Sequence, residues 1–118
     1  NALIQLPDRK VDARKAYEKA RKLLEDRLEQ RPSDGWLMVT IAMIHVRLGE
    51  GKTSLPLLDK ALALAPNNPD VHFQAACAYE LMGLRNSALA EIDKAKQLGF
   101  SEAKIRSEPI LKELLKTM

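Results

Sequence analysis

The feature that most constrains the fold of this chain is an internal repeat with a period of 34 residues. When the chain is shifted by this period, residues that pack closely, cap helices or end helices fall on residues of a similar kind. The matches are Pro32 with Pro66, Asp34 with Asn68, Gly49 with Gly83, Ala42 with Ala76, Ala61 with Ala95, Ala20 with Ser54 and Ala88, and Leu24 with Leu58 and Ile92. Such a period indicates a stack of similar units, each burying an apolar face against the next.

Helix boundary signals divide each unit into two helices. Asp34 and Asn68 belong to the residue types that cap helices, and Pro69 suits the first helical position after such a cap. Gly49 and Gly83 lie where each first helix must end, and glycine readily adopts the left-handed conformation that closes many helices. Each unit is therefore predicted to be a helix, a short turn and a second helix.

Residues 49–54 read GEGKTS and share letters with a phosphate-binding loop. That motif needs a glycine where this chain has Val46, and it needs a strand before the loop so that helix N–H groups face the phosphates. The apolar run before Gly49 is long for a strand. We expect a turn between two helices here, with Thr53 or Ser54 capping the second helix.

The period and these residues resemble the tetratricopeptide repeat (TPR), a helix–turn–helix unit. In that family the first helix carries a large, an aliphatic, a small and a Tyr residue, and the second carries Ala, a large apolar residue and Ala, followed by Pro. The matching residues are Met38, Ile41, Ala42, His45, Ser54, Leu58, Ala61 and Pro66 in one unit, and His72, Ala75, Ala76, Tyr79, Ala88, Ile92 and Ala95 in the next. The resemblance covers 35–100 and implies an all-α fold, an α-α superhelix of antiparallel helical hairpins.

The resemblance and the helix signals together predict five segments. These are an N-terminal segment over 1–11, a solitary helix over 12–34, TPR units over 35–68 and 69–100, and a C-terminal capping helix over 101–118. The solitary helix has an apolar face formed by Ala13, Ala16, Ala20, Leu24 and Leu28. The capping helix is expected to cover the last unit with Ile110, Leu111, Leu114 and Leu115.

The resemblance also implies a concave groove lined by the first helices of successive units. The positions that match it are Trp36, Val39, Thr40, Met43, Asp70, Phe73, Gln74 and Cys77. Residues 36–48 are apolar on every side, so the groove side of this helix is expected to need a cover. Three covers remain open: the segment 1–10, a second copy of the chain, or a partner's helix or peptide. No basic residue lies among these positions, which argues against capture of a peptide's terminal carboxylate.

Other residues give little support for catalysis, metal binding or nucleic-acid binding. His45 and His72 occupy packing positions of the repeat, and Cys77 lies five residues from His72, on a different face of the same helix. The net charge of +3 is mild, and Arg14 and Arg21 are each followed four residues later by Glu. We therefore expect no cofactor, no metal and no nucleic acid as partner.

The sequence thus predicts a non-catalytic protein–protein interaction or scaffold module. It would bind a helix or peptide, or self-associate as a homodimer, through the apolar groove. A nucleic-acid-binding helical repeat and nucleotide binding at GEGKTS remain as alternatives. One cysteine and the lack of an 18-residue apolar stretch favour a cytoplasmic location without a membrane span.

The two ends of the chain carry hints about its context. The chain begins Asn-Ala, a pair typical of the remnant of a cleaved tag, which would make it a piece of a longer protein. The ending KQLGFSEAKIRSEPILKELL resembles tails that close such arrays in bacterial signalling proteins.

Overall fold

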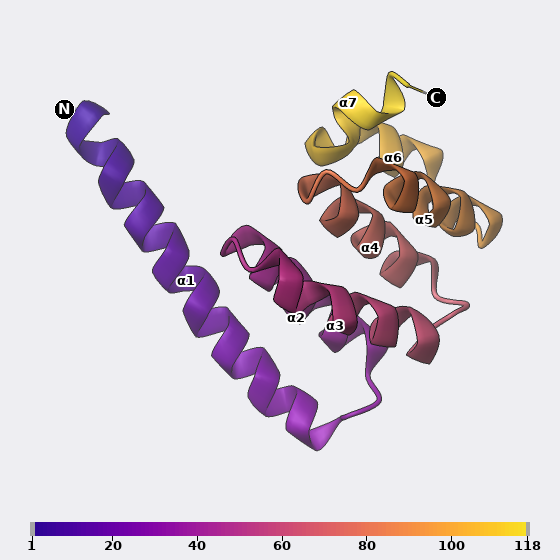
Figure 1. The fold of residues 1–118 in the computed structure, drawn as a ribbon, viewed down its shortest axis with the longest axis horizontal. Helices are drawn as coiled ribbons and strands as arrows, with labels where there is room; N and C mark the ends of the chain where they lie inside the picture. Colours follow the sequence, from indigo (N-terminus) through magenta and orange to yellow (C-terminus); the bar gives the residue numbers. More distant parts are fainter. Residues whose placement is uncertain (1, 118) are drawn as a thin grey trace.

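The computed structural model describes the backbone of residues 2–117 and the side chains of residues 11–117. Every regular element in this part of the chain is helical, which confirms the all-α prediction (Figure 1). The elements are α1 (Ala2–Gln30), α2 (Gly35–Arg47), α3 (Gly51–Leu64), α4 (Pro69–Leu81), α5 (Arg85–Gln97), α6 (Glu102–Ser107), the 3₁₀ helix η1 (Pro109–Leu111) and α7 (Lys112–Leu115).

The helix boundaries repeat with the period of the sequence. α2 and α4 begin at Gly35 and Pro69, and α3 and α5 begin at Gly51 and Arg85, so both pairs are offset by 34 residues. α2 packs along α3, α4 packs along α5, and α2 also packs against α4 (Figure 1). The two pairs of helices therefore lie side by side, as neighbouring units of one array.

The predicted caps of α2 and α4 are confirmed. The Asp34 side chain accepts a hydrogen bond from the backbone N–H of Leu37 at 3.1 Å. The Asn68 side chain accepts from the N–H groups of Asp70 and Val71 at 2.9 and 3.3 Å. These bonds satisfy N–H groups that the first turn of a helix leaves without a partner.

The turn at GEGKTS joins two helices, as predicted, but its cap differs from the prediction. Gly49 has a φ of +80°, and α3 begins at Gly51, with Glu50 as its N-cap residue. Thr53 and Ser54 therefore lie inside α3, and the prediction that either one caps it is wrong. Because the left-handed glycine reverses the chain at once, the helix starts earlier; the Ser54 hydroxyl donates to the carbonyl of Gly51 at 2.7 Å.

The core consists of the positions that repeat in the sequence. Leu58 and Ile92, the equivalent residues of the two second helices, are both fully buried, at 0% exposure. Small residues pack beside them at equivalent positions, namely Ser54, Ala61, Ala88 and Ala95. Close packing through small side chains also explains Gly35, where an added Cβ would lie 2.8 Å from the Cβ of Ala65.

The C-terminal segment covers the second unit, but it is not the single helix that we predicted. It forms α6, η1 and α7, because Pro109 holds Glu108 in an extended conformation, with φ −81° and ψ 114°, and so ends α6. Leu111 and Leu114 are fully buried in the core, as expected of a segment that closes the array.

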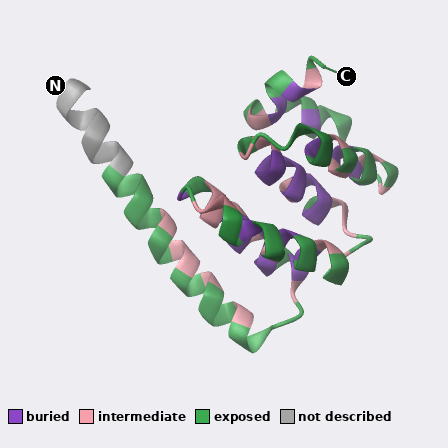
Figure 2. Ribbon diagram, in the orientation of Figure 1, coloured by how far each residue is buried: buried purple, intermediate pink, exposed green. Residues whose placement is uncertain are grey.

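The first helix is long and only lightly packed. α1 begins at Ala2, ten residues before the predicted start, and it runs along one edge of the molecule (Figure 1). None of its residues from 11 to 30 is buried, whereas α2 and α4 are mostly buried (Figure 2). Its half-buried residues are Tyr17, Ala20, Arg21, Leu24 and Leu28. The side chains of segment 1–10, one of the three expected covers of the groove, lie outside the described residues.

Candidate interaction surface

The structure divides the predicted groove residues into two groups. Val39, Phe73 and Cys77 are buried and belong to the hydrophobic core. The other five lie at the surface or are half-buried: Trp36, Thr40, Met43, Asp70 and Gln74. The predicted stripe is therefore interrupted, and its most apolar part in the second unit is already covered.

The cover of Phe73 comes from the C-terminal side of the chain. The ring of Phe73 stacks on the ring of Phe100, with centroids 4.4 Å apart and an angle of 15° between the planes. The ammonium group of Lys104 lies 6.0 Å from the centroid of the Phe100 ring, within the range of a cation–π contact. The three covers that we expected concerned the groove side of residues 36–48, and none of them was Phe100. In the repeat, Phe100 stands 34 residues after Pro66.

The five remaining residues form what we call the Trp36 surface. Trp36 and Thr40 of α2 stand one repeat before Asp70 and Gln74 of α4, so the two pairs occupy equivalent positions on neighbouring helices. Trp36 is the large apolar residue of this surface that is exposed to solvent, at 44%. The Thr40 hydroxyl donates to the carbonyl of Trp36 at 2.8 Å, so it is already engaged within α2.

His72 is a packing residue, as expected, but it also joins α4 to α5 and to the end of the first unit. Its Nδ1 lies 2.5 Å from Oε2 of Glu91 on α5, and its Nε2 lies 2.8 Å from the carbonyl oxygen of Pro66. The ring therefore ties α4 to α5 and to the turn that precedes α4. In the first unit the equivalent residues are Met38 and Leu57, so the second unit has a hydrogen-bonded polar pair where the first has an apolar one.

The Cys77 thiol is buried and poorly reactive. Burial, reinforced by the negative charge of Glu108, raises the pKa of the thiol from 9.0 to about 12. Since the thiolate is the nucleophile, this difference of three pH units leaves roughly a thousandfold less of the reactive form than in an exposed cysteine. Cys77 therefore acts as a small apolar residue of the core.

The GEGKTS turn anchors α1 to the α2–α3 pair. Arg21 donates to Oε1 of Glu50 at 3.1 Å, and Nδ1 of His45 lies 3.4 Å from the same oxygen. Arg14 donates to the carbonyl of Leu48 at 3.4 Å. The element before the turn is helix α2, whereas a phosphate-binding loop follows a strand.

A basic hollow lies between α5 and the C-terminal helices. Lys96, Arg106, Lys112 and Lys116 line it together with Leu115. Glu102 lies 3.5 Å from Lys96 and 4.0 Å from Arg106, and Glu113 lies 3.3 Å from Lys116. Acidic neighbours thus offset three of the four cations, and the residues that line the hollow include no aromatic side chain on which a base could stack.

Two further properties concern the described part of the chain. Among the side chains of residues 11–117, no group of three or more from His, Cys, Asp or Glu is placed to hold a metal ion. No helix between residues 2 and 117 combines the length and the apolar character needed to cross a membrane.

Comparison with protein-family models, with curated proteins and with solved structures gives no match in any of the three cases. The resemblance to the tetratricopeptide repeat therefore depends on the residues quoted above.

Proposed function

We propose that this chain is a non-catalytic protein–protein interaction module of the tetratricopeptide-repeat type. Its ligand is a helix or peptide of a partner protein, and the Trp36 surface is the contact site. The chain would serve as a scaffold within a longer protein, consistent with the resemblance of its C-terminal segment to tails of bacterial signalling proteins.

The observation that carries this proposal is the half-exposed Trp36. A large aromatic side chain left in water is unfavourable, and Trp is enriched among residues that contribute most to binding at protein interfaces. Thr40, Asp70 and Gln74, at the neighbouring and equivalent positions of α2 and α4, are exposed or half-buried polar residues that can form the polar rim of an interface. Because these residues occupy equivalent positions on α2 and α4, an elongated ligand would meet the same two positions in each unit.

A displayed library of amphipathic helical peptides tests the proposal. We expect selection on the wild-type protein to yield peptides that lose affinity by about 30-fold or more for Trp36→Glu, because removing a binding hot spot costs about 2 kcal/mol or more. Isothermal titration calorimetry with the selected peptides measures this loss.

The matched control is Leu84→Glu. Leu84 is 40% exposed, similar to Trp36, but it lies at the turn before α5. The selected peptides should bind this variant as tightly as wild type. Failure to select any peptide, or equal binding to Trp36→Glu and wild type, would contradict the proposal.

A further inference from the structure

The repeat register shows that α1 lacks the packing partner that α3 and α5 have. Leu24 of α1 is equivalent to Leu58 and Ile92, yet it is only half-buried while both equivalents are fully buried. Ala20 likewise is half-buried, whereas its equivalents Ser54 and Ala88 are fully buried. α2 covers α3, and α4 covers α5. Within residues 2–117, no helix covers α1 in the same way.

Residues that are exposed or only half-buried form one continuous side of α1, which we call the α1 face. Its members are Ala13, Ala16, Ala20 and Leu23, spaced alternately by three and four residues, as in the seam of a two-helix coiled coil. Leu23 is 58% exposed, the highest value among the exposed large apolar residues between 11 and 117. Small residues with one protruding leucine allow a second helix to approach closely.

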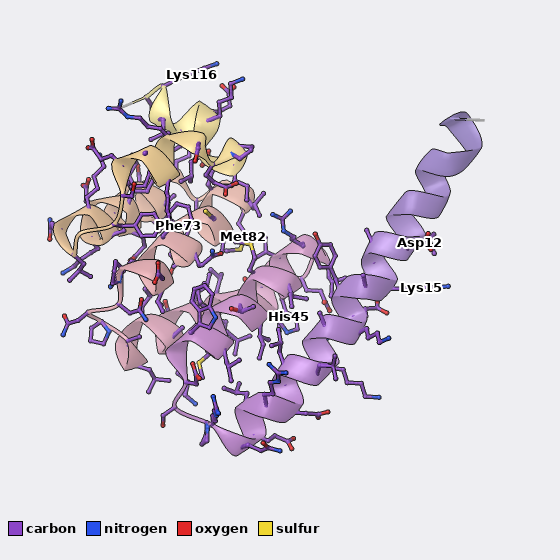
Figure 3. The ribbon with its side chains drawn as sticks, turned by 180° about the vertical axis from the view of Figure 1, so that it is seen from behind. Asp12, Lys15, His45, Phe73, Met82 and Lys116 are labelled. Atoms are coloured by element: carbon purple, nitrogen blue, oxygen red, sulfur yellow. The ribbon has the colours of Figure 1, made fainter. Side chains whose placement is uncertain are left out.

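The charges beside the α1 face match those of a second, antiparallel α1. Asp12, Lys19 and Asp26 follow one another at intervals of seven residues, so they lie along one edge of the face. All three side chains are exposed, and Asp12 points away from α2 (Figure 3). The opposite edge, with Tyr17 and Leu24, is half-buried, on the side of α1 that packs on α2. A second helix must therefore meet the Asp12–Lys19–Asp26 edge.

We propose that two copies of this chain pair through the α1 face in antiparallel orientation. In an antiparallel pair this edge faces the same edge of the other copy. A register that brings Lys19 of each copy to Asp26 of the other forms two identical ion pairs. The same register places Ala20 of one copy beside Leu23 of the other, so that the protruding leucine meets a small residue. The inference rests on the proposed class of function but uses a surface other than the Trp36 surface.

Charge reversal tests both the pairing and its direction. Sedimentation velocity should show wild-type protein passing from monomer to dimer as concentration rises. Lys19→Asp alone and Asp26→Lys alone should each weaken dimerisation about tenfold or more, because both symmetry-related pairs become repulsive. An equimolar mixture of the two variants should regain the wild-type affinity as a heterodimer, since each copy then supplies the charge that the other needs.

Leu23→Glu should abolish the dimer, and circular dichroism checks that its helix content is unchanged. Wild type that stays monomeric, a dimer that tolerates Leu23→Glu, or a mixture of the charge variants that remains monomeric would each overturn the inference. The Leu23→Glu protein is also tested with the peptides selected on the Trp36 surface. If the wild-type protein does not dimerise but the peptides bind, the pairing of α1 is wrong and the proposed function stands. If the peptides do not bind either, the proposed function is contradicted as well.

Discussion

Replacing Leu58 by alanine is expected to lower the free energy of unfolding by about 3 kcal/mol, within the range for a fully buried leucine. Ile92→Ala should cost a similar amount, because Ile92 is equivalent to Leu58 and equally buried. Leu24→Ala, at the equivalent position of α1, should cost about 1 kcal/mol or less, because that side chain is already partly in contact with water. Urea denaturation measures all three values.

The comparison uses one substitution at equivalent positions, so its result depends on packing and not on side-chain chemistry. Equal losses for Leu24→Ala and Leu58→Ala would show that α1 is covered as fully as α3. That outcome would contradict the view that the array has an open first helix.

His72→Met is expected to destabilise the protein by about 3 kcal/mol, because it leaves the mostly buried carboxylate of Glu91 without its partner. Glu91→Leu should cost a similar amount, because it leaves the buried His72 ring without one of its two hydrogen-bond partners. The double variant His72→Met with Glu91→Leu should recover most of the loss, since it copies the apolar pair Met38 and Leu57 of the first unit. Thermal unfolding followed by circular dichroism gives the three stabilities.

The two single variants and the double variant form a thermodynamic cycle, which isolates the coupling between positions 72 and 91. If the losses simply add in the double variant, the His72–Glu91 pair is not coupled in the way that the hydrogen bonds indicate. Met38→His in the first unit provides a matched comparison, because there the new ring would face Leu57 and no carboxylate.

The regular part of the fold could be predicted because its signals are local and repeated. Asp34, Asn68, Gly49 and Gly83 act through neighbouring backbone groups, so their roles follow from sequence alone. Burial of Leu58 and Ile92 follows from the period, since each unit must pack on the next.

The prediction failed where the period ends. Phe100, the last residue of the second unit, covers Phe73, and no spacing rule connects these two residues. The break in the capping helix, by contrast, had a local signal in Pro109, which disfavours a helical conformation for the residue before it.

For the candidate site, the sequence placed Trp36, Thr40 and Asp70 on an accessible side of their helices but did not separate them from buried Val39 and Cys77. Which face of an apolar helix stays exposed depends on its neighbours in space. The His72–Glu91 pair was missed for a different reason. Its signal was the charge of Glu91 at the position of Leu57, which becomes visible only when the two units are compared residue by residue.

The claim on which the inferred pairing depends most is that one side of α1 is open to a second helix. Thiol labelling measures this directly, because the buried Cys77 is the single native cysteine and contributes little background. In dilute protein, a cysteine introduced by Leu23→Cys should react as fast as one in an unfolded peptide, whereas the near-isosteric Ser54→Cys should react only when the protein unfolds. Equal protection of both cysteines in dilute protein would show that the α1 face is covered and would contradict the account.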